Sequence, residues 1–261
     1  MILAAAEKQF SILGISSHSA YPFASTWHIP PRETASYTEE IRALAQKYRE
    51  KITVLCGFEA DFIPGISAPS MQNYAPFKPD YIIGSVHYIV TKNGSFTVDD
   101  SAENVQNGVN AFFGGDARKA VCEYFRLQRE MLHHGDFHIW GHPDLFRKRN
   151  GALRLFNEND SWYRAELQAT AEAAAKAGVI AEINTGAISR GAMNDVYPSR
   201  DFLQMLAERK VPVTLSSDAH STEGLDCAFE RAIQAAKNAG YTETAYIDAN
   251  GTVRFQKIES T

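Results

Sequence analysis

Acidic and imidazole side chains recur in this sequence directly after short runs of β-forming residues. His18 follows ILGIS, Glu59 follows ITVLCGF, and His87 follows YIIGSV. The arrangement returns three more times, at His142 in GHPDL, at Glu182 and Asn184 in AEINTG, and at Asp218 and His220 in SSDAH. One such residue commonly caps a strand or forms a turn. Six successive strand ends with the same chemistry are difficult to attribute to chance.

Imidazole and carboxylate groups together are ligands for divalent ions such as zinc, manganese and iron. Without a metal, clustered carboxylates would repel one another and raise one another's pKa. The strand ends therefore predict a metal centre. Four other histidines do not follow a strand, and we expect them to be structural or solvated: His28, His133, His134 and His138.

The pattern of strands and helices predicts how these residues could meet. The β-forming runs cover 12–16, 52–58, 81–86, 137–140, 179–183 and 212–216, and helical patterns cover 38–50, 116–133, 161–177, 200–209 and 226–239. Strands that alternate with helices pair in parallel through right-handed crossovers. In a closed β/α barrel the active site lies at the carboxyl ends of the strands, where all these side chains would converge.

Length and composition limit the number of domains and the kinds of partner that the chain can have. The 261 residues, 44% of them hydrophobic, suit one barrel domain, which needs about 250 residues, so we expect residues 1–261 to form a single domain. A net charge of −5, without a Lys/Arg run, argues against a nucleic-acid partner. The three separated cysteines are typical of reduced thiols in a cytoplasmic protein. The opening MILAAA is too short for a secretory signal, and no run is long enough to span a membrane.

Residues 90–115 differ from the rest of the chain. TKNGSF predicts a hairpin turn, and the residues that follow have weak periodicity. Such a segment beside a strand end could contribute to a substrate lid or could be an ordinary surface excursion.

Several stretches resemble the PHP (polymerase and histidinol phosphatase) superfamily, and most of all its histidinol-phosphatase branch. They are GISSH, GFEADFIPG, KPDYIIGSVHYI, GHPDL, AEINTGAISRG and YPSRDFLQMLAERKVPVTLSSDAH. The similarity runs from about residue 2 to about residue 245. It implies an α/β fold, a distorted (β/α)7 TIM-like barrel, with up to three divalent ions (Zn, Mn or Fe).

The resemblance places the metal ions among six residues: His18, Glu59, His87, His142, Asp218 and His220. Glu59 would bridge two metals, and His87 and His142 would share the second metal with it. Asp218 would face the first metal, and His18 and His220 the third. Glu182 and Asn184 would orient these ligands, with Glu182 as a direct ligand the alternative.

Other residues are expected to act on the substrate. Arg190, in GAISRG, resembles the family's phosphate-binding arginine, and a guanidinium fork suits phosphate oxygens; a surface arginine is the alternative. We expect Glu59, Asp218 and Arg190 to be catalytic and Arg190, Asp61 and His220 to bind substrate. Asp61 would either meet a substrate ammonium group or support the metal ligands.

The sequence departs from the family at its start. Relatives begin with a strand that ends in an HxH motif, followed by a loop and a helix that resembles residues 1–10. The helix is present here, but the first strand is not, which corresponds to a stretch of about 20 residues. An internal Met taken as the start and genuine loss are both open explanations. Ser17 also stands where relatives often have Asp. We expect the chain without this strand to be less stable and less active than one that carries it.

The resemblance implies hydrolysis of a phosphate monoester, with L-histidinol phosphate as the small-molecule substrate. A PHP-type nuclease or nucleotide phosphoesterase would use the same ligands, and a barrel without the HxH pair could be catalytically impaired, with fewer metals. We expect no membrane partner. An exposed sheet edge would favour pairing, which leaves a homodimer open.

Overall fold

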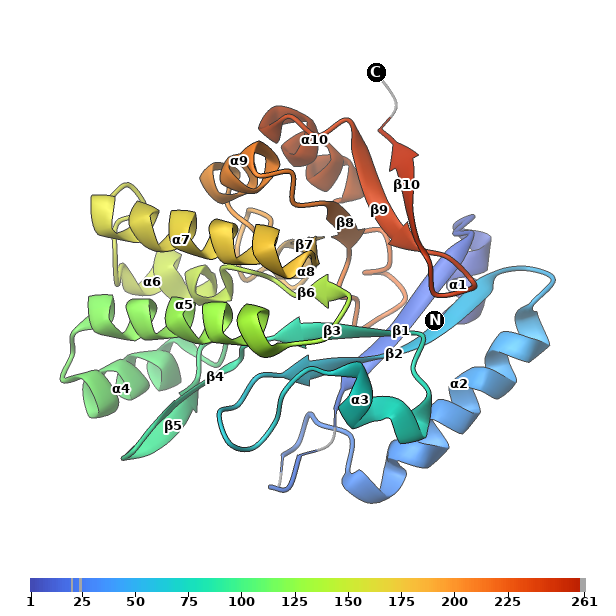
Figure 1. The fold of residues 1–261 in the computed structure, drawn as a ribbon, viewed down its shortest axis with the longest axis horizontal. Coiled ribbons are helices and arrows are strands. Elements are labelled where there is room, and N and C mark those ends of the chain that lie inside the picture. The colour runs from blue at the N-terminus through green and yellow to red at the C-terminus, as the bar shows by residue number, and fades with distance from the viewer. Residues whose placement is uncertain (20, 24, 259–261) are drawn as a thin grey trace.

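A curled sheet of six parallel strands forms the centre of the molecule (Figure 1). The structure is a computed structural model that describes residues 1–19, 21–23 and 25–258. The strand order is β1-β2-β3-β6-β7-β8. The strands are β1 (Ile12–His18), β2 (Thr53–Asp61), β3 (Tyr81–Ser85), β6 (Ile139–Trp140), β7 (Ile180–Asn184) and β8 (Val213–Ser216). Each lies within or overlaps a run that the sequence predicts, and the parallel pairing brings their carboxyl ends to one edge.

Helices connect and cover these strands. They are α1 (Ile2–Glu7), α2 (Thr34–Tyr48), α3 (Met71–Tyr74), α4 (Ala102–Phe113), α5 (Ala117–His134), α6 (Asn150–Leu153), α7 (Ser161–Ala177), α8 (Gly186–Ser189), α9 (Arg200–Glu208) and α10 (Phe229–Ala239). Asp116 caps α5 by accepting from the Lys119 amide at 3.1 Å, and α7 ends before Gly178, whose φ is 71°, as helix-end rules predict. Among the described residues no helix combines the length and apolar character needed to cross a membrane.

Two hairpins lie outside the central sheet. The predicted turn at TKNGSF joins β4 (Tyr88–Thr91) to β5 (Gly94–Thr97), which pair antiparallel. Helix α4 follows, although its periodicity is weak, because it packs on β5: a Cβ at Gly108 would lie 2.3 Å from Cγ of Phe96. A second hairpin, β9 (Glu243–Ile247) with β10 (Val253–Lys257), lies beside α10 (Figure 1). The sequence pattern of residues 243–257 does not predict this hairpin.

The main core lies between the middle strands and the long helices. Trp140 of β6 is fully buried, and its ring lies 5.8 Å from that of Phe202 on α9. Its indole N–H donates to Gln128 of α5 at 2.7 Å. Almost all of β2 is buried, as expected for a parallel strand that is covered on both faces. The middle of the sheet is therefore held by a backbone ladder and by side-chain packing together.

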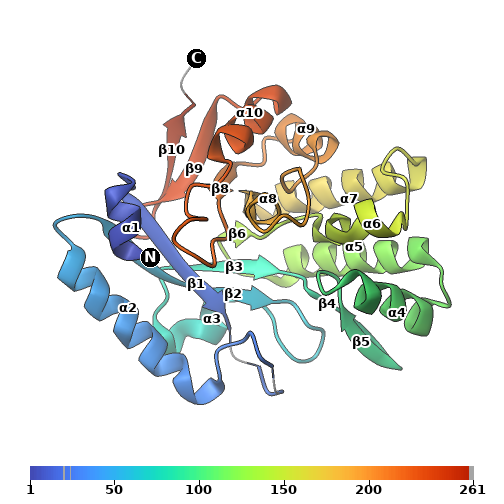
Figure 2. The ribbon, with the colours of Figure 1, turned by 180° about the vertical axis from the view of Figure 1, so that it is seen from behind.

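The sheet does not close into a barrel. Within the described residues, the outer edges of β1 and β8 have no paired strand. A cavity of about 520 Å³ separates them, lined by Leu13 to His18 on one side and Ser216 to His220 on the other. Figure 2 shows where β1 and the loop that follows β8 lie in the fold. The architecture is thus an open half-barrel of the TIM-like type, which agrees with the expectation of a barrel without its first strand.

Candidate metal centre

Glu59 lies at the centre of a cluster of imidazoles. Its Oε1 atom is 2.9 Å from Nε2 of His142 and 3.5 Å from Nε2 of His87. Its Oε2 atom is 3.6 Å from Nδ1 of His18. These four residues, called the inner cluster below, come from the carboxyl ends of β1, β2, β3 and β6. Parallel pairing explains the convergence, because β1 places His18 opposite Glu59 in register.

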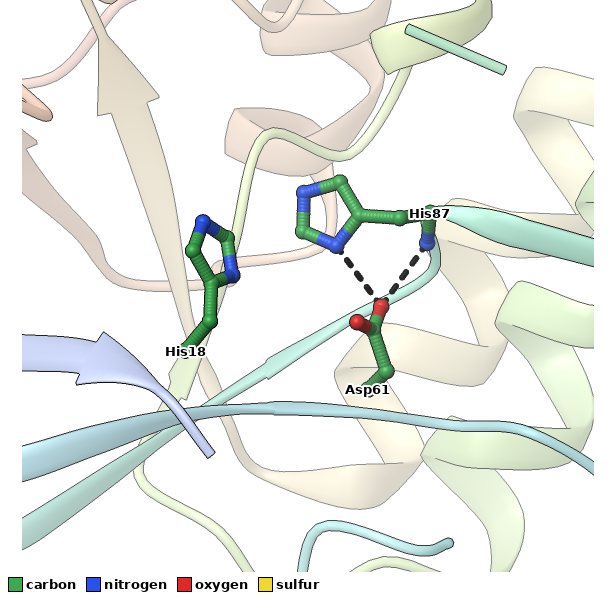
Figure 3. Close-up of side chains that lie close together, drawn as sticks. All are labelled: His18, Asp61 and His87. Carbon is green, nitrogen blue, oxygen red and sulfur yellow. Dashed lines mark hydrogen bonds and ion pairs between the residues drawn. The ribbon is translucent and has the colours of Figure 1, made fainter. Parts of the chain in front are cut away.

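Buried partners hold the inner cluster in place. Asp61 accepts at Oδ1 from both the amide and Nδ1 of His87, at 2.9 and 2.7 Å (Figure 3). Tyr21 contacts Oδ2 of the same carboxylate at 3.2 Å, and Ser85 donates to Oε1 of Glu59 at 2.8 Å. A carboxylate only accepts, so the neutral His87 ring carries its proton on Nδ1 and leaves Nε2 free for a metal.

Asp61 has no exposed surface. The alternative in which this carboxylate meets a substrate ammonium group does not fit that burial, because both of its oxygens already have protein partners. Its place in the structure is behind His87, where it fixes the orientation of the ring.

Charge is concentrated in this buried volume. Burial opposes ionisation of Glu59, but the imidazoles of His18, His142 and His87 outweigh it and hold the pKa of Glu59 well below its usual value. Burial also favours neutral His87, yet Asp61 and Glu59 raise the pKa of His87 to about 10. Burial lowers the pKa of His18, whereas the pKa of His142 is raised through its hydrogen bond to Glu59, like that of His87. The carboxylates therefore favour a compensating positive charge close to them.

Glu182 and Asn184 of β7 line the cavity, and they also hold His142 in place. Glu182 accepts at Oε2 from the His142 amide at 2.7 Å and from Nδ2 of Asn184 at 3.0 Å. His142 needs this support because its φ is +23°, a conformation that non-glycine residues seldom adopt. Backbone strain of this kind collects at functional sites.

A second group lies across the cavity, on the segments after β8 and α8. Arg190 donates through Nη2 to Oδ2 of Asp218 at 2.7 Å and through Nη1 to the Asp218 carbonyl at 2.7 Å. The same Nη1 lies 3.0 Å from Nδ1 of His220. Asp218 also has a positive φ, +46°. Gly186 permits the approach, since a Cβ there would lie 2.7 Å from Arg190 Nη2 and 2.8 Å from Asp218 Oδ2.

The two groups share one cavity. His18, Glu59 and His142 line the 520 Å³ opening together with Asp218 and His220. His87 lies behind Glu59, with 5% of its side chain exposed. The structure thus brings all six predicted metal ligands to one end of the sheet. The inner cluster is close-packed, while Asp218, His220 and Arg190 form a separate set on the other side.

The donors suit a divalent metal. In the set Glu59–His87–His142, and likewise in His18–Asp61–His87, the candidate ligand atoms all lie within 4.8 Å of one another. Nδ1 of His18 and Nδ1 of His142 are buried without a hydrogen-bond partner, which is costly unless another partner is supplied. Buried carboxylates, imidazoles that can exchange a ring proton for a metal, and unsatisfied nitrogens together form a site for one or more divalent ions.

The remaining histidines lie elsewhere or play other parts. His133 and His134 end α5, and His138 accepts the Ile82 amide at 3.3 Å. His28 is buried among aromatic rings near His18. Ser85 and Tyr21, which hold the carboxylates of Glu59 and Asp61, were not predicted from the sequence. Ser85 ends β3 two residues before His87 and could have been found from that position, whereas Tyr21 lies in a loop with no sequence signal.

Comparisons with known proteins agree with this architecture. The sequence model of the PHP domain matches residues 1–186. A relative from Deinococcus radiodurans, named "Probable histidinol-phosphatase", is 29% identical over 239 residues, which are 91% of this chain and 85% of the relative.

Two solved structures share the fold. A candidate histidinol phosphatase of Listeria monocytogenes aligns with a TM-score of 0.78 at 19% identity, over 88% of this chain and 92% of its own. The histidinol phosphate phosphatase of Lactococcus lactis, solved with zinc, L-histidinol and phosphate, aligns with a TM-score of 0.66 at 17% identity, over 97% and 90%.

Proposed function

The chain belongs to the PHP domain family, and from that premise we propose that it is a metal-dependent phosphomonoester hydrolase that acts on L-histidinol phosphate. The observation that carries the proposal is the meeting of Glu59 with three imidazoles at the carboxyl end of the sheet. The name of the Deinococcus relative and the ligands of the Lactococcus structure support histidinol phosphate among phosphomonoesters.

We assign the metal ions to the inner cluster together with Asp218 and His220. When bound, divalent ions polarise the phosphoryl oxygens and lower the pKa of a water molecule that attacks phosphorus. Asp61 and Glu182 orient His87 and His142 toward the ions, so that the imidazoles need little rearrangement on binding. Zinc, manganese and iron all suit this donor set. We expect one to three bound ions per chain, which elemental analysis of the protein would count.

Arg190 is assigned to the phosphate. In the structure its guanidinium fork is directed at the Asp218 carboxylate and carbonyl and at His220. A phosphoryl group that reaches the metal ligands therefore comes within reach of the fork. Arg190 would take up the charge that develops on the phosphoryl oxygens in the transition state, and Gly186 keeps the space that this requires.

The test is phosphate release by the full chain after removal of metal and reconstitution with manganese or zinc. We expect turnover of L-histidinol phosphate that depends on the added metal and that falls steeply in Arg190→Gln. Arg154→Gln, a change of the same chemistry at an exposed position, is the matched control. Short oligonucleotides and nucleotide monophosphates serve as competing substrates.

Each outcome has a definite meaning. Faster turnover of oligonucleotides or nucleotides would replace the proposal with a nuclease or nucleotide phosphoesterase. Bound metal without turnover of any phosphomonoester would indicate a binding role. Equal loss of activity in Arg154→Gln would remove the assignment of Arg190 to phosphate.

A further inference from the structure

Aromatic side chains gather beside the inner cluster, in the loop after β1 and at the start of β4. Trp27 lies in the loop after β1, and its ring centroid is 3.9 Å from that of His28 and 5.6 Å from that of Tyr88, with the Tyr88 ring nearly parallel at 12°. Phe23 lies 5.7 Å from both His28 and Tyr88. We call Phe23, Trp27, His28 and Tyr88 the aromatic wall.

Two members of the aromatic wall are exposed to solvent, although their side chains are large and apolar. Trp27 is 39% exposed and Phe23 is 37% exposed, whereas most large apolar side chains of this chain are buried. His28 is buried beneath them, with Tyr21 at 4.2 Å and the Tyr88 hydroxyl 3.5 Å from its Nε2. The two exposed rings are thus backed by the same neighbours, His28 and Tyr88, and exposed apolar side chains that gather beside a cavity often form a binding surface.

Trp27 reaches from this wall to the metal donors. Its ring centroid lies 4.6 Å from that of His18 in an edge-to-face arrangement and 5.6 Å from that of His87. It also lines the 520 Å³ cavity together with Glu59, Asp218 and His220. A molecule whose phosphate contacts the metal ligands and Arg190 therefore shares this cavity with the Trp27 indole.

We propose that Trp27, backed by His28 and Tyr88, selects phosphomonoesters whose alcohol carries a cationic amine or a flat ring. This inference rests on the proposed function, since it assumes a phosphate at the metal donors. Tryptophan is the aromatic side chain that attracts cations most strongly through its ring face, and flat rings stack on it favourably.

The test compares two substrates in three variants. L-histidinol phosphate carries both an amine and a ring, and butyl phosphate carries neither. Trp27→Leu is expected to lower kcat/KM for L-histidinol phosphate by about 10-fold, mainly through KM, and to change butyl phosphate less than about 2-fold. Trp27→Phe, which keeps a ring, is expected to restore most of the loss. Phe255→Leu, an exposed aromatic on β10, is the matched control.

Other outcomes overturn the inference. Because Trp27 packs against His18, bound metal is measured in every variant. An equal loss on both substrates, together with lost metal, would mean that Trp27 only supports the metal site. Unchanged kinetics on both substrates would mean that it does not touch the alcohol.

A binding measurement separates this inference from the proposed function. Tryptophan fluorescence of the metal-loaded full chain is titrated with L-histidinol in the presence of inorganic phosphate, and Trp27→Leu supplies the background from Trp140 and Trp162. A response that needs Trp27, without hydrolysis of L-histidinol phosphate, would uphold the wall and refute the proposed function. Hydrolysis without such a response, and without the kinetic difference, would uphold the proposed function and refute the role of Trp27 in selecting the alcohol.

Discussion

The middle strands and the edge strands of the sheet deliver their functional side chains in different ways. Strands β2, β3 and β6 each pair on both sides, and Glu59, His87 and His142 follow from them with 5–11% of each side chain exposed. Strands β1 and β8 each pair on one side, and they lead to His18, Asp218 and His220, whose side chains are 19–62% exposed. A ligand on a middle strand is therefore fixed by burial, and a ligand on an edge strand is fixed mostly by its local contacts.

The difference concerns preorganisation. Glu59 and the His87 ring have partners that orient them without any metal, namely Ser85 and Asp61. Asp218 and His220 are oriented by Arg190, a residue that we assign to the substrate. We infer that the inner cluster binds metal in a nearly finished geometry, while the other side of the cavity reorganises when metal and phosphate arrive.

The largest expected effect is on the free energy of unfolding, when a side chain is truncated on a middle strand and on an edge strand. Phe58 of β2 is fully buried and lies 5.0 Å from the Tyr74 ring, whereas Leu13 of β1 borders the open cavity. Phe58→Ala should lower the free energy of unfolding by about 3–5 kcal/mol. Leu13→Ala should lower it by about 2 kcal/mol, the low end for its type, because Leu13 packs on one side only and borders the cavity on the other. Urea denaturation measures both, and equal losses would abolish the contrast.

The next effect concerns metal affinity on the middle strands. Loss of a group that merely orients a metal ligand weakens metal binding by about 10- to 100-fold. Glu59→Gln, which changes the carboxylate that contacts three imidazoles, should reach at least about 100-fold, with a matching loss of turnover. Metal titration and elemental analysis measure it. Glu123→Gln on the surface of α5 is the control, and a normal metal content in Glu59→Gln would refute the assignment.

A smaller effect is expected from the edge side. His220 has 62% of its side chain exposed, so its replacement leaves no buried donor unsatisfied. His220→Asn should weaken metal binding by about 10-fold or less, and the loss should fall on the last ion to bind if more than one is present. An effect as large as that of Glu59→Gln would show that both sides of the cavity form a single rigid site.

These contrasts also explain how far the sequence alone could lead. The six strands were predictable because each contains a run of β-forming residues, and a parallel sheet necessarily gathers the side chains at their ends. Helix α4 was not predictable in the same way, because Gly108 weakens its intrinsic preference and packing against Phe96 compensates.

The residues that hold the metal ligands from surrounding loops were even harder to predict from the sequence. Tyr21 contacts Asp61 across 40 residues. Trp27 reaches His18 and Tyr88 through a loop. Such contacts depend on how a loop folds over the strand ends, and neither periodicity nor spacing encodes that.

The smallest expected effect tests what holds the open side together. Between α1 and α10 the ring centroids of Phe10 and Phe229 lie 6.0 Å apart, on the two sides of a gap that no described strand fills. A double-mutant cycle of Phe10→Leu and Phe229→Leu, followed by urea denaturation, should give a coupling of about 0.5–1.5 kcal/mol, the range for an aromatic pair.

Backbone pairing of a strand would add a ladder of hydrogen bonds on each edge, and single ring contacts do not replace it. In a chain with a strand added ahead of Met1, the Phe10–Phe229 coupling should therefore be a smaller fraction of the total free energy of unfolding. A coupling well above the aromatic range, or an added strand that leaves the stability unchanged, would mean that side chains already close the half-barrel.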